Sequence, residues 1–196
     1  MAKTLLELAG ADLTPPKLSD AVLVVIDAQN EYVDGKLPLP GAKPALANIA
    51  RLLAKARADG GLIVHVQHRG RAGGAFDPAT RAFAIADEAA PKAGETVVEK
   101  PLPNSFAGTT LNEKLTSMGA KRLVLAGFMT HMCVSSTARA ALDLGYQTTV
   151  VADACATRDL PTGKGGDISA ADLHRAELAA LADRFSIVCD ADILTN

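Results

Sequence analysis

The sequence lacks three features that mark large classes of protein: a bias of charge, long apolar runs and many cysteines. Its 196 residues carry 20 basic and 22 acidic side chains, for a formal net charge of −2. No basic run is interleaved with aromatic residues, so we expect no nucleic-acid partner. No apolar stretch reaches the length of a membrane span, so we expect no membrane partner either.

The three cysteines, Cys133, Cys155 and Cys189, are odd in number and widely spaced, which does not suit a disulfide framework. The N-terminal segment contains Glu7 and too short an apolar run for a secretory signal. Together these features predict a cytoplasmic protein with reduced thiols. The length is typical of one domain with a sizeable core, so we expect residues 1–196 to form a single domain.

Short apolar runs alternate with helix-like segments along almost the whole chain. Continuous apolar and β-branched runs of this kind are typical of strands that are buried on both faces of a parallel sheet. The alternation predicts a three-layer α/β fold, in which helices cover both faces of a six-stranded parallel sheet of order 3-2-1-4-5-6. The expected strands are residues 21–26, 62–66, 96–99, 122–126, 148–151 and 185–188.

Helix starts and long loops lie between these runs. Pro44 suits the first turn of the helix after the first strand. Thr110 and Glu113 have the spacing of a capping box at the start of a later helix. Two loops look long, 69–77 and 158–167, and loops at the carboxyl ends of parallel strands are where functional sites form.

One cysteine has a setting that favours reactivity. Cys133 follows the buried run 122–126 through the segment 127–133, which reads GFMTHMC. With Thr130 as the N-cap, Cys133 falls at the third position of a helix, where free N–H groups and the helix dipole favour the thiolate. We interpret Cys133 as a candidate nucleophile and the backbone N–H groups of Met129 and Cys133 as candidate oxyanion donors.

Two charged residues are expected at the same edge of the sheet as Cys133. Asp27 follows the first expected strand, and Lys100 follows the third. A carboxylate can take the proton of a thiol and later deliver it to a leaving amine, and an ammonium group stabilises neighbouring anions. Each residue alone also has a structural interpretation, as a buried apolar cysteine, a loop aspartate or a solvated lysine. Their convergence on one edge favours a hydrolytic site.

Three ordered motifs surround these residues and continue downstream. They are residues 25–32 (VIDAQNEY), 99–100 (EK) with 105–111 (SFAGTTL), and 127–134 (GFMTHMCV), followed by 137–139 (TAR), 145–146 (GY) and 153–154 (DA). Through these segments the chain resembles the isochorismatase-like cysteine hydrolase superfamily, and the resemblance extends over nearly its whole length. The resemblance implies a catalytic triad of Asp27, Lys100 and Cys133, and a cis peptide bond between Phe128 and Met129.

The histidines near the second expected strand do not suit a metal site. Zinc-dependent members of the superfamily carry an Asp-x-His motif in this region, whereas residues 65–70 of this chain read HVQHRG. His65 and His68 lie three residues apart on a strand, so their side chains are expected on opposite faces of the sheet. We therefore expect no metal and no other cofactor.

The presence of Cys133 favours one reaction over another within the superfamily. Isochorismatases cleave a vinyl ether and do not need the thiol, so a thiol favours hydrolysis of an amide or ureido C–N bond of a small molecule through a thioester. Two alternatives stay open. One is an isochorismatase-type vinyl ether hydrolase, and the other is a catalytically silent member of the fold that binds a metabolite.

Three further residues are candidates for binding the substrate. Gln67 lies at the end of the second strand, His131 lies beside the nucleophile, and Phe106 can form a wall of the pocket; each also has a packing or loop interpretation. Members of the superfamily commonly form dimers and tetramers, so we expect a homodimer or homotetramer.

Overall fold

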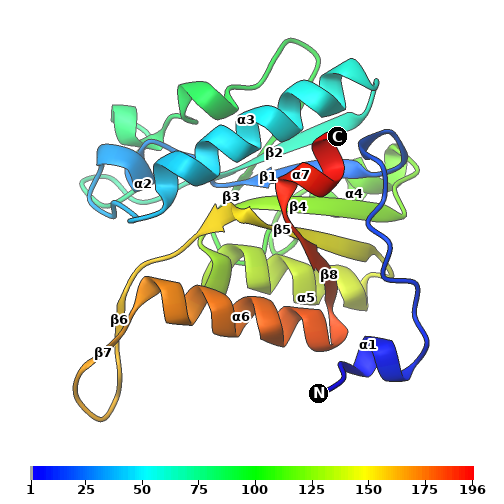
Figure 1. Cartoon of the computed structure of the whole chain (residues 1–196). Helices are drawn as coiled ribbons and strands as arrows, with labels where there is room; N and C mark the ends of the chain where they lie inside the picture. The colour runs from blue at the N-terminus through cyan, green and yellow to red at the C-terminus, as the bar shows by residue number, and fades with distance from the viewer. Residues whose placement is uncertain (1) are drawn as a thin grey trace.

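Six parallel strands form the central sheet of the computed structural model, which describes residues 2–196 (Figure 1). The strand order is β3-β2-β1-β4-β5-β8. This confirms the predicted order 3-2-1-4-5-6, because β8 is the sixth strand of this sheet along the chain. All neighbouring strands pair in parallel. The strands are β1 (Val22–Ile26), β2 (Leu62–His68), β3 (Thr96–Lys100), β4 (Arg122–Phe128), β5 (Gln147–Ala156) and β8 (Ser186–Cys189).

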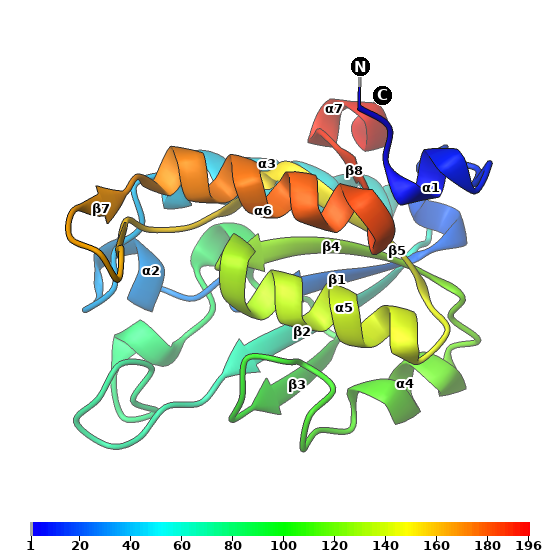
Figure 2. The same ribbon diagram turned by 90° about the horizontal axis from the view of Figure 1, so that it is seen from below.

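Helices cover both faces of this sheet, which gives the three layers expected from the sequence. Figure 1 shows α3 (Ala42–Ala58) and α7 (Ala191–Thr195) over one face, with α5 (Ser135–Asp143) and α6 (Ala170–Arg184) over the other. Figure 2, turned by 90°, shows α5 and α6 running along the sheet. Among the described residues, none of the helices combines the length and hydropathy of a membrane span. The shorter helices are α1 (Leu5–Leu8), α2 (Glu31–Asp34) and α4 (Leu111–Ser117), with 3₁₀ turns at Leu18–Asp20, Arg81–Phe83 and Asp87–Ala89.

Two apolar clusters join the sheet to its two helix layers. All five side chains of β1 are buried. Leu23 and Val25 belong to the cluster that contains the apolar face of α3, whereas Val22, Val24 and Ile26 belong to the cluster shared with α4, α5 and α6. Burial on both faces explains why this strand is continuously apolar rather than alternating.

The start of one helix agrees with the sequence-based expectation and that of another differs. α3 begins at Ala42, so Pro44 lies in its first turn as expected, where the missing N–H breaks no intrahelical hydrogen bond. Thr110 is the N-cap of α4, but its side chain makes no capping hydrogen bond, so the predicted capping box is wrong. The neighbouring Thr109 hydroxyl instead accepts a hydrogen bond from the N–H of Leu111 (3.2 Å).

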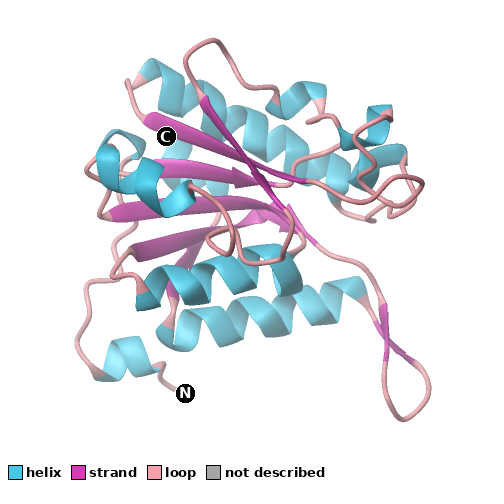
Figure 3. Cartoon of the chain, turned by 180° about the vertical axis from the view of Figure 1, so that it is seen from behind, coloured by secondary structure: helices cyan, strands magenta, loops and turns pink. Residues whose placement is uncertain are grey.

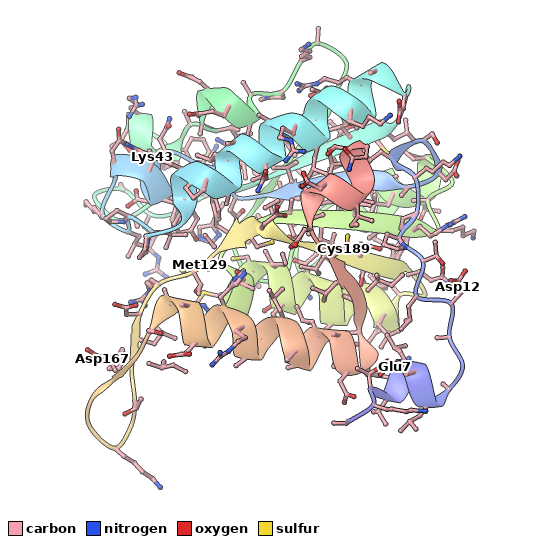
Figure 4. The ribbon with its side chains drawn as sticks, in the orientation of Figure 1. Glu7, Asp12, Lys43, Met129, Asp167 and Cys189 are labelled. Carbon is pink, nitrogen blue, oxygen red and sulfur yellow. The ribbon has the colours of Figure 1, made fainter. Side chains whose placement is uncertain are left out.

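The segment expected to be a loop over residues 158–167 contains a short hairpin. β6 (Leu160–Pro161) pairs antiparallel with β7 (Asp167–Ile168). Figures 1 and 3 show this hairpin extending beyond α6 and away from the sheet. Figure 4 labels Asp167 on the hairpin and Met129 in the body of the domain.

Candidate active site

Three side chains from three strand ends meet at the carboxyl edge of the sheet. Lys100 Nζ lies 2.7 Å from Asp27 Oδ2 and 3.2 Å from Cys133 Sγ. The Asp27 carboxyl and the Cys133 thiol are close enough that each group shifts the pKa of the other. The three residues are almost completely buried, with exposed fractions of 0% for Asp27, 1% for Lys100 and 4% for Cys133. A carboxylate, a cation and a thiol therefore share one site that is shielded from water.

Asp27 turns the chain sharply at the end of β1. Its φ of +51° lies in the left-handed region, which aspartate tolerates better than most residues. The Asp27 N–H donates to the carbonyl of Val66 (2.8 Å), so the residue extends the pairing of β1 with β2. Burial raises the pKa of Asp27 to about 6, against the opposing effect of the Lys100 ammonium. A carboxylate with this pKa is suited to accept a proton near neutral pH.

Lys100 ends β3 and reaches across the end of β2. Its Nζ donates to the carbonyl of Leu102 (3.1 Å) and lies 3.4 Å from His68 Nδ1, in addition to its contacts with Asp27 and Cys133. Burial and the charge of Lys100 lower the pKa of His68 to about 4, so the imidazole is neutral at pH 7. A neutral imidazole nitrogen can accept a hydrogen bond from the ammonium group. The buried cation is therefore surrounded by polar partners.

An unusual path of the chain after β4 places Cys133. Gly127 has a φ of +126°, and a Cβ at this position would lie 1.9 Å from the Ile26 carbonyl oxygen, so only glycine fits against β1. The peptide bond between Phe128 and Met129 is cis. A π-helical turn, Thr130–Val134, then carries Cys133 and leads into α5.

The setting of Cys133 differs from the predicted first turn of an α-helix. The N-cap of the π-helical turn is Met129, and the Thr130 hydroxyl lies 2.8 Å from His174 Nδ1 instead of capping the turn. Burial, together with the charge of Asp27, raises the pKa of the Cys133 thiol to about 12. The N–H groups of the turn favour the thiolate, whereas burial, the largest effect on this pKa, favours the thiol. The thiol is protonated at neutral pH, and attack by its sulfur requires a base.

The sequence of the chain is similar to those of known proteins. Residues 21–193 match the family model of the isochorismatase domain. The chain belongs to the isochorismatase family. A relative, the secreted isochorismatase effector Isc1 of Verticillium dahliae, is 44% identical over 176 residues, which cover 89% of this chain and 90% of Isc1. The ureidoacrylate amidohydrolase RutB of Stutzerimonas stutzeri is 30% identical over 174 residues, which cover 70% of each protein.

A solved structure extends the likeness to the whole isochorismatase-family fold. The crystal structure of an isochorismatase from Pseudomonas putida KT2440 is 46% identical and superposes with a TM-score of 0.95, covering 99% of this chain and 100% of that one. The family is one of hydrolases, and this chain is a hydrolase. Its fold and its chemical class are thus established.

Two of the candidate substrate-binding residues of this isochorismatase-family hydrolase have structural contacts of their own. The Gln67 amide donates to the carbonyl of Phe83 (2.9 Å), which holds the segment after β2 against the strand end. Phe106 stacks on Tyr146, with ring centroids 5.9 Å apart and an interplanar angle of 13°. Neither contact requires a substrate to explain it.

The third candidate, His131, lies within the turn that carries the nucleophile. Its Nδ1 is 2.5 Å from the hydroxyl of Thr157, which follows the end of β5. Burial lowers the pKa of His131 from its usual value. The contact joins the Cys133 turn to the segment after β5.

The two histidines of β2 have separate partners. His65 Nε2 lies 2.9 Å from Glu95 Oε2, and Glu95 in turn pairs with Arg57 (2.7 Å). His68 instead contacts Lys100. Within residues 2–196, no group of three or more His, Cys, Asp and Glu side chains is placed to hold a metal ion. The two histidines thus contact different residues, Glu95 and Lys100, and do not form a shared set of metal ligands.

Sequence reasoning missed two residues of this edge. Gln29 is fully buried and clamps the end of β2: its amide donates to the carbonyls of His68 (2.9 Å) and Phe83 (2.7 Å), and its oxygen accepts from the His68 N–H (2.8 Å). A polar residue two positions after Asp27 was the available signal. The other residue, Arg158, follows β5 and is the first residue of the segment 158–167, which the sequence marks only as a long loop.

Proposed function

We propose that this chain is a cysteine hydrolase that cleaves an amide or ureido C–N bond of a small molecule through a thioester, without a metal ion or other cofactor. The observation that carries the proposal is a buried cluster in which Lys100 contacts both the thiol of Cys133 and the carboxyl of Asp27. A protonated thiol next to a carboxylate base has what covalent acyl transfer needs. The relative RutB is named an amidohydrolase, which supports the same type of bond.

In the first half-reaction the sulfur of Cys133 attacks the carbonyl carbon of the substrate. The thiol proton passes to Asp27, whose pKa of about 6 leaves the carboxylate ionised at pH 7. The backbone N–H groups of Met129 and Cys133 donate to the oxyanion of the tetrahedral intermediate. When the intermediate collapses, the C–N bond breaks and Asp27 gives its proton to the leaving nitrogen. The products are an amine or ammonia and a thioester on Cys133.

In the second half-reaction water hydrolyses the thioester. Asp27 takes a proton from the attacking water molecule, the C–S bond breaks, and the proton on Asp27 restores the Cys133 thiol. Lys100 keeps its positive charge throughout, because it neither gives nor takes a proton in this scheme. Its charge stabilises the sulfur anion as that anion forms and holds the carboxylate of Asp27 in place.

Intact-mass spectrometry after brief incubation with a panel of small amides and ureido compounds tests this proposal. We expect a transient acyl adduct on the wild-type protein and on the matched control Cys189→Ser, and none on Cys133→Ala. Ammonia release by Cys133→Ala at the wild-type rate would contradict the covalent mechanism. Turnover of isochorismate by the wild-type protein and by Cys133→Ala, without ammonia release from any amide, would favour the vinyl ether hydrolase. Binding of the panel without turnover of any compound would favour the catalytically silent alternative.

Two other expectations stay predictions. A homodimer or homotetramer is checked by size-exclusion chromatography with light scattering. Location in the cytoplasm is checked by cell fractionation, and family membership alone does not decide it, because the relative Isc1 is named a secreted effector.

A further inference from the structure

His68 borders the catalytic cluster, although the proposed reaction gives it no task. It is the register partner of Lys100 at the carboxyl ends of the neighbouring strands β2 and β3. His68 Nδ1 lies 3.4 Å from Lys100 Nζ, which in turn contacts Asp27 and Cys133. Ligand sites contain a small number of polar groups that orient the bound molecule, and a polar ring in this place is suited to be one of them.

The contact with Lys100 fixes which nitrogen of His68 carries the proton. An ammonium group has three N–H donors and no acceptor, so the nitrogen that faces it is an acceptor without a proton. That nitrogen is Nδ1. Burial and the charge of Lys100 lower the pKa of the ring to about 4, so the imidazole is neutral at pH 7 and its single proton is on Nε2. His68 is therefore a hydrogen-bond donor through the nitrogen on the far side of its ring.

The Nε2–H group of His68 has no partner in the part of the chain that the structure describes. Within residues 2–196 Nε2 makes no hydrogen bond, and it is not one of the fully buried polar atoms that lack a partner. His65 differs, because its Nε2 faces Glu95 and its Nδ1 is buried without a partner. The ring of His68 is only partly buried, so its free donor is open to a small molecule bound at the catalytic cluster.

Two buried side chains from the segment after β1 fix the position of His68. The oxygen of Gln29 accepts from the His68 N–H (2.8 Å), and its amide donates to the His68 carbonyl (2.9 Å). The carboxylate of Glu31 accepts from the N–H of Phe76 (3.0 Å), and the ring of Phe76 packs edge-on against the imidazole, with centroids 4.9 Å apart. Phe76 has a φ of +55°, a conformation that a residue other than glycine keeps only where its surroundings hold it. The donor is therefore oriented before a substrate binds.

The order of the strands places this donor on one side of the reacting carbonyl carbon. The proposed oxyanion donors, the N–H groups of Met129 and Cys133, follow β4, whereas His68 ends β2. β1 lies between these two strands and carries Asp27 at its end. Asp27 gives its proton to the leaving nitrogen in the proposed reaction. The part of the substrate that departs with this nitrogen therefore lies on the side of His68, opposite the oxyanion.

We propose that the Nε2–H of His68 donates a hydrogen bond to a carbonyl oxygen in the leaving part of the substrate, so that the molecule cleaved at Cys133 is an N-substituted amide and not a primary amide. The inference rests on the proposed function of the site. The sulfur forms its bond to the carbonyl carbon, the C–N bond breaks, and the leaving nitrogen takes its proton from Asp27. His68 exchanges no proton in these steps. Its hydrogen bond holds the leaving group in place while that bond breaks.

Matched pairs of amides test this inference on the Cys133→Ala protein, which keeps His68 and cannot form a thioester. N-acetylurea is paired with N-isopropylacetamide, and N-acetylglycinamide with N-isobutylacetamide. The two molecules of a pair have nearly the same shape, and only the first has a carbonyl oxygen in its leaving part. Dissociation constants are measured by NMR titration. We expect the first molecule of at least one pair to bind about tenfold more tightly, as one further hydrogen bond in a partly buried site predicts.

Two substitutions, each added to Cys133→Ala, separate the roles of the two nitrogens of His68. His68→Asn keeps a polar group near the position of Nδ1, next to Lys100, but has no atom at the position of Nε2, so the preference should disappear. His68→Gln places an amide near the position of Nε2 and should keep part of the preference. The matched control is Arg175→Asn, a change at a residue of α6 whose side chain is 81% exposed, and it should keep the full preference.

Nitrogen NMR of the histidine rings tests the assigned tautomer without any ligand. We expect Nδ1 of His68 at the downfield shift of an unprotonated imidazole nitrogen and Nε2 at the upfield shift of a protonated one. The signals of His68 are assigned by their loss in His68→Asn. A proton on Nδ1 would overturn the inference, because a neutral ring would then have none to donate from Nε2.

The outcomes separate this inference from the proposed function. If neither pair shows the preference, or if the preference survives His68→Asn, the inference is wrong. Loss of folding in both His68 variants, seen by circular dichroism, would assign the residue a structural role instead. None of these results depends on turnover. The preference can therefore fail while an acyl adduct forms on Cys133, or hold while no adduct forms.

Discussion

Lys100 Nζ lies 2.7 Å from Asp27 Oδ2, and both side chains are fully buried. Such a pair contributes little net stability, because removing two charges from water offsets their attraction. Its effect is on protonation: burial raises the pKa of Asp27, and the ammonium limits that rise to about 6. The carboxylate is therefore ionised at neutral pH and still basic enough to accept the thiol proton.

Hydrolysis is expected to depend on pH through Asp27. The carboxyl acts as a base only when it is ionised, so kcat/KM should fall as the pH drops through about 6 and level off above it. Asp27→Asn removes the base and should lower kcat by about 10²- to 10⁴-fold. The measurement is the profile of kcat/KM against pH for a substrate found with the amide panel. A profile that is flat across pH 6 would contradict this role of Asp27.

Lys100→Met should move this acidic limb. The ammonium is the strongest of the groups that oppose the effect of burial on Asp27, so without it the pKa of the carboxyl rises and the midpoint of the profile should shift above about 6. We also expect kcat to fall by about 100-fold, because the sulfur anion loses its nearest cation. Lys43→Met, at an exposed position of α3 that Figure 4 labels, is the control and should change neither quantity. A limb that stays at pH 6 in Lys100→Met would mean that another group titrates there.

The Arg57–Glu95–His65 network should stabilise the fold in a pH-dependent way. Hydrogen bonds, first of all that from Arg57, lower the pKa of Glu95 from 4.5 to about 2. A carboxyl whose pKa is lower in the folded state contributes stability above its unfolded pKa and loses it as the pH falls toward the folded value. Glu95→Gln should therefore lower the free energy of unfolding by about 2 kcal/mol at pH 7, with a difference that shrinks between pH 4.5 and pH 2.

Urea unfolding at several pH values measures the effect of Glu95→Gln. Glu113→Gln on α4 is the control, because Glu113 is exposed and its substitution should change stability by less than about 0.5 kcal/mol. An equal loss for Glu95→Gln at pH 7 and at pH 2 would assign the effect to packing and not to charge.

Gly127→Ala should destabilise the fold far more than an alanine at another glycine of positive φ. The new Cβ would lie 1.9 Å from the Ile26 carbonyl oxygen, so β1 and β4 would have to separate at the point where Asp27 and Cys133 are placed. We expect a loss of at least about 3 kcal/mol. Gly119→Ala, where φ is +69° and no atom lies within 4 Å, isolates the backbone strain and should cost only about 1 kcal/mol. Similar losses for the two variants, measured by urea unfolding, would contradict the close approach.

The proximity of Asp27, Lys100 and Cys133 was predictable because each residue follows or ends a strand of one parallel sheet. Parallel strands bring their carboxyl ends to the same edge, and right-handed crossovers leave few possible strand orders. The side chains of β1 illustrate the same point, because a continuously apolar strand must be covered on both faces. The fold and the grouping of these residues therefore followed from local patterns.

The protonation of Cys133 was not predictable in this way. The local sequence shows only the N–H groups of the turn, which favour the thiolate, whereas the pKa of the thiol depends on burial by segments that are distant in sequence. Arg158 was missed for a related reason. Among residues 2–196 its Nε is buried without an acceptor, and this burial arises only in the folded chain.

The buried thiol also has a consequence for chemical damage. Peroxides attack thiolates, and the first product, a sulfenic acid, can proceed to irreversible acids. With a pKa of about 12, Cys133 offers almost no thiolate while the enzyme is at rest. The arrangement that makes the nucleophile depend on Asp27 therefore also protects it from oxidation between turnovers.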